Sequence, residues 1–199
     1  MPETSVSVAK KPLRFGDEVR FIRSWLEKPL STGAVMPSGK ALARTMARYV
    51  DTNSTGPVIE LGAGTGPVTE ALVAHGVHPS RLVLVEFNPG FCRLLRQRFP
   101  QATVVQGDAY SLRTTLADVL TEPADAVVSG LPLMTKPLRT RLRMVFDAFS
   151  LLKPNAPIVQ FTYAVVSPIP RGLGGIQSEA SEPIWANLPP ARVWVYRKG

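Results

Sequence analysis

Two carboxylates and three glycines are the residues whose types and spacing say most about chemistry in this chain. Residues 58–66 read VIELGAGTG, so a short apolar run contains Glu60 and is followed by glycines at alternate positions. Glycine accepts positive φ and lets a ligand approach the main chain, so this run predicts a strand, a tight turn and a helix. A second apolar run, 81–86, ends at Glu86. A carboxylate at that place can accept both hydroxyls of a ribose, so the two runs predict a nucleoside-containing cofactor at the carboxyl edge of a parallel sheet.

The glycine spacing distinguishes between nucleoside cofactors. The NAD fingerprint is G-x-G-x-x-G, with a helix N-terminus facing a pyrophosphate. This chain has G-x-G-x-G after Glu60, whose charge would repel a phosphate and suit a cation. The pattern E-x-G-x-G-x-G resembles motif I of class I S-adenosylmethionine-dependent methyltransferases, and that cofactor has a ribose, an ammonium and a sulfonium but no phosphate. A glycine loop alone is a weak signal, but Glu86 and the QGDA segment at 106–109, after a third strand at 103–105, strengthen the assignment.

The resemblance implies a set of cofactor-binding residues. The backbone of residues 62–66 is expected against the methionine part, with Glu60 facing its positive charge. Glu86 is expected at the ribose and Phe87 over an adenine face, with Asp108 accepting from the adenine amino group. The full expected set is Glu60, Gly62, Ala63, Gly64, Thr65, Gly66, Glu86, Phe87, Asp108, Ala109 and Ser129. The sulfonium methyl is already a strong electrophile, so the protein mainly has to align an in-line displacement that leaves S-adenosylhomocysteine.

Composition limits the architecture and the partners. The 199 residues are 45% hydrophobic, which suits one domain with a substantial core. The net charge of +8 favours a polyanion or an anionic surface as partner. The one cysteine, Cys92, forbids an internal disulfide and is typical of a reducing compartment. No apolar run reaches the roughly twenty residues needed to cross a bilayer, and no signal peptide is recognisable.

Strands and helices alternate along the chain, which predicts an α/β fold. The pattern implies a doubly wound, Rossmann-like and mostly parallel sheet, with an antiparallel strand pair at 182–186 and 192–197 as in class I methyltransferases. A Pro/Gly-rich loop at 167–176 is expected to stay out of the core, and we interpret it as a substrate lid. The other predicted elements are strands 58–61, 82–86, 103–105, 125–129 and 157–163, helices 13–28, 40–50, 67–75, 89–98 and 138–151, and a mixed segment 109–121.

The segment after the fourth strand, 129–133, bears on the methyl acceptor. Its carbonyls, beside Ser129 and Gly130, are the expected acceptors for an incoming amine. Methyltransferases that act on adenine amino groups carry Asn or Asp where this chain has Ser129, and an aromatic residue where it has Leu133. Both departures argue against a base as acceptor. Bacterial 16S rRNA adenine dimethylases are otherwise similar but carry an additional helical domain. An rRNA adenine N6-methyltransferase is thus the alternative function, with nucleic acid the less favoured partner.

The chain more closely resembles the soluble, PmtA-like bacterial phospholipid N-methyltransferases. The segments that carry this resemblance are 21–26 (FIRSWL), 33–38 (GAVMPS), 58–66, 129–133 and 160–163 (QFTY). It implies methylation of phosphatidylethanolamine, through mono- and dimethyl forms, to phosphatidylcholine at the membrane surface. A non-catalytic module that binds S-adenosylmethionine or membranes is a third hypothesis, disfavoured by the complete set of motif residues.

Residues 1–50 are predicted to form a membrane-contacting segment ahead of a methyltransferase domain at 51–199. The helix at 13–28 has an apolar stripe opposite basic side chains, and residues 1–50 carry a net charge of +5, from nine basic and four acidic side chains. Such a helix can lie in the interface of an anionic bilayer, or pack its stripe on the domain. We expect a cytoplasmic protein at the inner face of the cytoplasmic membrane, bound to anionic lipid and the phosphatidylethanolamine head group, with no obligate protein partner.

Three further residues are expected at the acceptor. Tyr163 would orient the head group by oxygen contact or cation–π attraction. Arg171 would hold the lipid phosphate, and Leu131 would line the site. His75 and His78 are expected at the surface, and the spacing of histidines, cysteine and acids predicts no metal site.

Overall fold

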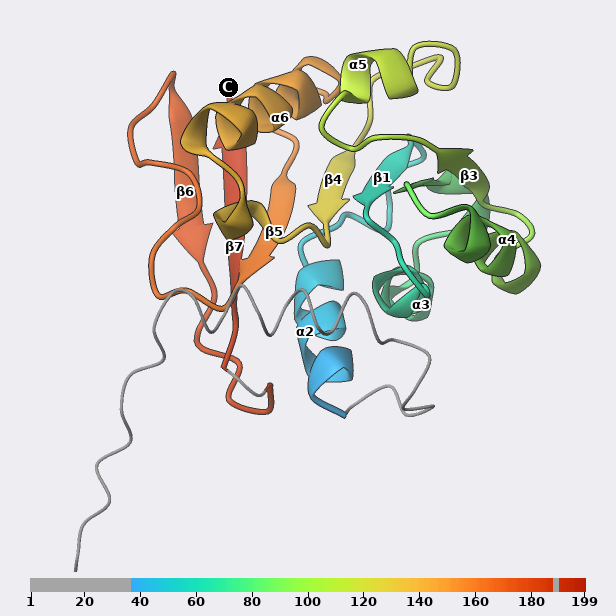
Figure 1. The fold of residues 1–199 in the computed structure, drawn as a ribbon, viewed down its shortest axis with the longest axis horizontal. Helices are drawn as coiled ribbons and strands as arrows, with labels where there is room; N and C mark the ends of the chain where they lie inside the picture. The colour runs from blue at the N-terminus through green and yellow to red at the C-terminus, as the bar shows by residue number, and fades with distance from the viewer. Residues whose placement is uncertain (1–36, 188–189) are drawn as a thin grey trace, which may run out of the picture. The chain divides into compact units, whose positions relative to one another are not determined.

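This computed structural model describes residues 37–187 and 190–199. In this part of the chain, strands alternate with helices as the sequence predicts. The elements are α2 Pro37–Ala47, β1 Val58–Leu61, α3 Pro67–His75, η1 Pro79–Arg81, β2 Leu82–Glu86, α4 Pro89–Arg98, β3 Thr103–Gln106, α5 Leu112–Thr115, β4 Ala126–Ser129, η2 Leu133–Thr135, α6 Leu138–Ser150, β5 Ile158–Thr162, β6 Ile176–Ala180 and β7 Arg192–Lys198 (Figure 1).

The strands form one sheet of order β3-β2-β1-β4-β5-β7-β6. Strands β1 to β5 are parallel, and β7 runs antiparallel to both β5 and β6. The fold class predicted from the sequence is therefore confirmed. Strand order reverses between β1 and β4, and ligands of such sheets bind beside this switch point, at the carboxyl ends of the strands.

Helices cover both faces of the sheet (Figure 1). Successive residues of a strand point to opposite faces of the sheet. Val58 therefore packs in the core with α2, α3 and Leu95 of α4, whereas Ile59 packs in the core with α5 and α6. Strands β1, β2 and β4 are buried on both faces, as their continuous apolar runs predict, while β3 is a half-exposed edge strand.

Helix α2 belongs to the packed core. Its stripe of Leu42 and Met46, continued by Val50, is buried against the sheet, so the helix predicted at 40–50 forms at 37–47. Residues 37–50 thus share the core of the domain that we predicted to begin at 51. The helix predicted at 13–28 lies outside the described residues. Of the helices that are described, none has the length and apolar character needed to cross a bilayer.

The C-terminal prediction needs two corrections. Strand β6 forms at 176–180 and not at 182–186, where Ile184 makes only an isolated bridge with Ala191. The predicted loop 167–176 also contributes to the core, because Ile169 is 1% exposed and Ile176 is 5% exposed under α6. Ile169 and Ile176 are single apolar residues next to prolines or glycines, so no periodic pattern in the sequence predicts their burial.

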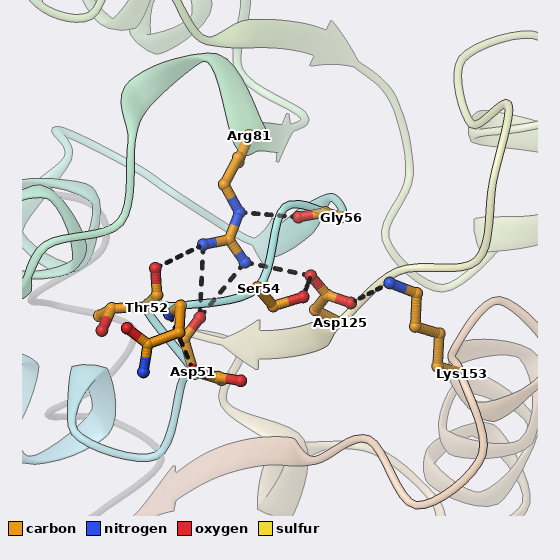
Figure 2. A network of polar contacts seen from close by, with 8 residues as sticks. Asp51, Thr52, Ser54, Gly56, Arg81, Asp125 and Lys153 are labelled. Carbon is orange, nitrogen blue, oxygen red and sulfur yellow. Dashed lines mark hydrogen bonds and ion pairs between the residues drawn. The ribbon is translucent and has the colours of Figure 1, made fainter.

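A polar network ties together the segments at the amino ends of β1, β2 and β4 (Figure 2). The Arg81 guanidinium forms an ion pair with the Asp125 carboxylate at 3.1 Å and donates a hydrogen bond to the Gly56 carbonyl at 2.8 Å. Asp125 also accepts hydrogen bonds from the Ser54 hydroxyl and from the Lys153 ammonium. At the amino ends of the strands, the side chain of Asp125 therefore links the loops that precede β1, β2 and β5 through hydrogen bonds and ion pairs.

Candidate functional site

The glycine turn after β1 has all three glycines at positive φ: 71° at Gly62, 57° at Gly64 and 89° at Gly66. A Cβ at Gly62 would lie 2.8 Å from Leu131, and one at Gly66 would lie 2.6 Å from the Phe99 ring. A Cβ at Gly64 would meet nothing within 4 Å. The positive φ favours glycine at all three positions, and the Phe99 ring adds a packing restriction at Gly66, while Gly64 presents a bare backbone face to a ligand.

The Glu86 carboxylate lies directly beside this turn. One of its oxygens accepts from the Gly64 amide at 2.9 Å, and the other accepts from the Asn88 amide at 2.8 Å. The residue is 9% exposed at the carboxyl end of β2. Each carboxylate oxygen keeps a lone pair beyond these bonds, so Glu86 is fixed in orientation and can still accept from a ligand hydroxyl.

Glu60 lies beneath the turn and is 1% exposed. Burial raises its pKa to about 8, the Glu86 charge adds to that, and hydrogen bonds from Thr69 oppose it. The Thr69 hydroxyl donates to Glu60 at 2.7 Å from the first turn of α3. A buried carboxylate with a raised pKa is stabilised by a nearby cation. Sequence reasoning did not single out Thr69, although a threonine in the first helical turn after the glycine run was the available signal.

The residues expected at the adenine lie after β2 and β3, which are neighbours in the sheet. Phe87 is 76% exposed, which leaves a ring face available to a planar partner. The Asp108 side chain is exposed and accepts from the Tyr110 amide at 2.9 Å, and Ala109 is buried beside it. The structure thus brings both predicted segments to the edge that carries Glu86.

The segment after β4 contacts the glycine turn. The Gly130 amide donates to the Leu61 carbonyl at 2.8 Å, and a Cβ at Gly130 would lie 3.0 Å from the Gly62 carbonyl oxygen. Ser129 is completely buried. The segments that begin at Gly62 and Ser129, which are 67 residues apart in sequence, are therefore in direct contact.

Gln160 supports the segment after β4 from beneath, a role that sequence reasoning missed. It is fully buried on β5, and its amide donates to the Leu131 carbonyl at 2.8 Å and to the Phe161 carbonyl at 2.7 Å. The Leu131 carbonyl also accepts from the Leu133 amide at 2.9 Å. The signal was a polar residue inside a buried strand, since such a side chain must find hydrogen-bond partners.

Tyr163 directly follows β5 at the same edge. Its ring meets Phe161 edge to face with centroids 5.5 Å apart. Burial raises its pKa, and a hydrogen bond with Asn187 opposes that shift.

Arg171 lies on a segment that leads away from the carboxyl edge. Gly174, three residues on, lies against Phe146 of α6, and Ile176 pairs with Lys198 at the opposite edge. No described contact joins Arg171 to the glycine turn or to Ser129. The lid and the role of Arg171 at the lipid phosphate therefore stay predictions. His75 and His78 are exposed, as predicted.

Sequence comparison places this chain in a known family. A family model described as "Methyltransferase domain" matches residues 58–155. The ornithine lipid N-methyltransferase of Singulisphaera acidiphila is 35% identical over 146 residues, which are 71% of this chain and 76% of that protein. The chain belongs to the class I S-adenosylmethionine-dependent methyltransferases.

Solved structures agree with this methyltransferase fold. The N-methyltransferase NodS from Bradyrhizobium japonicum, in complex with S-adenosyl-L-homocysteine, has a TM-score of 0.63 at 14% identity and covers 88% of this chain and 97% of its own. The CcbJ methyltransferase from Streptomyces caelestis has a TM-score of 0.60 at 18% identity, and the match covers 83% of this chain and 97% of CcbJ.

A sequence relative with a nucleic-acid substrate in its name matches less completely. A ribosomal RNA small subunit methyltransferase A from Synechococcus is 34% identical over 138 residues, but the match covers only 45% of that protein.

The cofactor of this methyltransferase is S-adenosylmethionine, and the residues present fit it. Gly64 offers a bare backbone, Glu86 a carboxylate with free lone pairs, and Glu60 a buried carboxyl group whose ionised form a cation would stabilise. The bound cofactor supplies an electrophilic methyl group. The role of each individual residue in holding it stays a prediction.

Proposed function

We propose that this methyltransferase methylates the amine head group of a membrane lipid. Phosphatidylethanolamine is the first acceptor, carried through mono- and dimethyl forms to phosphatidylcholine, because the PmtA-like resemblance implies it. The observation that supports a lipid is the 35% identical relative, whose name specifies ornithine lipid. Ornithine lipid is therefore the second acceptor to test.

The segment after β4 supports an acceptor other than a nucleic-acid base. Leu133 stands where adenine methyltransferases carry an aromatic ring, and it is 2% exposed and packed in the core under α6. Ser129 stands where they carry an amide or acid, and its buried hydroxyl accepts from the Leu131 amide at 3.4 Å. Neither side chain is placed to stack on a base or to bind its edge.

The same segment offers a way to position an amine. Because the Leu131 carbonyl already accepts two hydrogen bonds, the Gly130 carbonyl is the better acceptor for a substrate N–H. An alkylammonium with a pKa of about 10 has no lone pair, so one proton must leave to water before transfer. The nitrogen lone pair then forms the new N–C bond as the S–C bond breaks. Tyr163, at the end of β5, is proposed to face the head group.

We propose that the enzyme works as a peripheral protein on an anionic membrane surface, at the inner face of the cytoplasmic membrane and without an obligate protein partner. The net charge of +8 supports binding to an anionic surface, since anionic lipids attract basic surfaces. The basic helix predicted at 13–28 is a second proposed contact.

The test is methyl transfer from radiolabelled S-adenosylmethionine to three acceptors in parallel. These are vesicles of phosphatidylethanolamine with phosphatidylglycerol, the same vesicles doped with ornithine lipid, and 16S ribosomal RNA. We expect label in lipid and none in RNA, with chromatography separating the mono-, di- and trimethyl products. Label in RNA alone would overturn the acceptor and leave the fold and cofactor standing.

A further inference from the structure

Two loops at the carboxyl edge of the sheet carry exposed apolar side chains. Residues 163–166 follow β5, and residues 181–187 follow β6; together we call them the docking rim. Val165 is 78% exposed, Val166 is 61% exposed and Trp185 is 76% exposed. Because β5 and β6 both run antiparallel to β7, both loops leave the sheet at the edge that carries the glycine turn.

The two loops of the docking rim are held together beneath their exposed tips. Tyr163 of the first loop hydrogen-bonds Asn187 of the second. The Ala164 amide donates to the Thr162 hydroxyl at 3.0 Å, and the Ile184 amide donates to the Ala191 carbonyl at 2.8 Å. Buried and hydrogen-bonded residues therefore anchor both loops, while valine and tryptophan side chains project outward.

Basic residues lie at the same edge of the sheet as these apolar tips (Figure 1). Arg192 begins β7 opposite Thr162, and no ion pair to it occurs within residues 37–187 and 190–199. Helix α2 has its amino end on the side of the docking rim, with exposed Lys40 in its first turns (Figure 1). The one acidic residue of the docking rim is Glu182. Exposed tryptophan and aliphatic side chains next to basic ones are what a lipid interface binds.

We propose that the docking rim inserts into the surface of an anionic lipid bilayer. Val165, Val166 and Trp185 enter the head-group region, and Arg192 faces the anionic group of a lipid. Tyr163 and the segment after β4 lie at this same edge, so a bilayer held there presents lipid amines to the methyl-transfer surface. This inference deepens the proposed lipid methylation and is separate from the helix predicted at 13–28.

Vesicle flotation with the full chain tests the docking rim. We expect the double variant Val165→Asp with Val166→Asp, and separately Trp185→Ala, to bind phosphatidylethanolamine–phosphatidylglycerol vesicles about tenfold more weakly. Arg192→Gln should reduce the gain in binding that phosphatidylglycerol gives. The matched control is Phe146→Asp, an apolar-to-acid change at a 37% exposed site on α6, and it should float as the wild type does. Thermal melting checks that each variant is folded.

Different results would overturn the two proposals. Rim variants that float as the wild type does, or a Phe146→Asp variant that loses as much binding, would overturn the docking rim even if lipid is methylated. A dimer that dissociates in the double variant, without vesicle binding by the wild type, would assign these loops to self-association and overturn it too. Vesicle binding that needs the docking rim, without methylation of any lipid, would instead overturn the proposed function alone.

Discussion

Two buried carboxylates at opposite edges of the sheet are stabilised in opposite ways. At the amino edge, burial tends to raise the pKa of Asp125, but hydrogen bonds from Lys153 and Ser54 and the charges of Lys153 and Arg81 hold it below its usual value. At the carboxyl edge, burial raises the pKa of Glu60 to about 8, and only Thr69 donates to it among the described residues.

This difference in pKa indicates that Asp125 has a structural role, whereas Glu60 is suited to bind a cationic ligand. Asp125 has its cations within the chain, so its charge holds the loops before β1, β2 and β4 together. Glu60 has no cation of its own in the described residues, and it lies under a backbone turn that is bare at Gly64. A cationic cofactor would supply at Glu60 what Arg81 and Lys153 supply at Asp125.

The largest effect is expected at the carboxyl edge with Glu86→Ala. Two hydrogen bonds to a charged acceptor contribute about 3 kcal/mol or more, so affinity for S-adenosylhomocysteine should fall at least a hundredfold. Titration calorimetry measures this, with Glu86→Gln as the shape-matched control that keeps one acceptor and loses less. Unchanged affinity in Glu86→Ala would contradict the assigned ribose contact.

At the amino edge, Asp125→Asn should cost stability and not cofactor affinity. Removing one partner of a buried ion pair leaves Arg81 uncompensated, so the free energy of unfolding should drop by about 3 kcal/mol. Urea denaturation measures this. The control is Glu179→Gln, whose pair with Arg197 is exposed and should cost at most about 0.5 kcal/mol. Equal losses from the two changes would show that the amino-edge network is not the stronger one.

Glu60 should leave a pH signature that Asp125 cannot. Its pKa is higher in the folded chain, at about 8, than the ordinary value of 4.5, so the folded state binds more protons between those values. Stability should therefore fall as pH rises through that window, by up to about 1.4 kcal/mol per pH unit, and level off above it. In Glu60→Gln this component should vanish. Urea unfolding of both proteins from pH 5 to pH 9 measures it, and parallel curves would mean that Glu60 keeps an ordinary pKa.

A smaller contrast is expected within the glycine turn. Gly64→Ala adds a Cβ to open space at φ 57°, so it should cost only the left-handed strain of about 1–2 kcal/mol. Gly66→Ala adds the same strain and a 2.6 Å approach to the Phe99 ring, so it should be less stable in thermal melting. Cofactor affinity should fall in Gly64→Ala even though it is the more stable variant. The reverse ranking in stability would contradict the packing described for the turn.

Much of the fold could be predicted from sequence because its core strands are buried on both faces. Continuous apolar runs and regular spacing locate β1, β2 and β4 to within a residue. The C-terminal elements could not be located in this way. Strand β6 is an edge strand whose one buried residue is Ile176, so its pattern does not differ from that of a loop.

The site was predictable where chemistry depends on backbone shape. Glycines at alternate positions and a strand-end carboxylate require the turn that Gly62–Gly66 and Glu86 form. Contacts between distant segments were not predictable, because Thr69 beneath Glu60 and Gln160 beneath Leu131 depend on register. Arg171 was assigned to the substrate because its loop follows β5, and that role stays a prediction. The burial of Ile169 in the same loop was not predictable, because it is one apolar residue between two prolines.

The most direct test of the account is hydrogen–deuterium exchange with and without S-adenosylhomocysteine. We predict slower amide exchange in peptides that cover residues 60–70, 86–90, 106–110 and 128–133, and unchanged exchange around Arg81, Asp125 and Lys153. Protection centred on the amino-edge network, or none at the glycine turn, would contradict the claim that the carboxyl edge holds the cofactor.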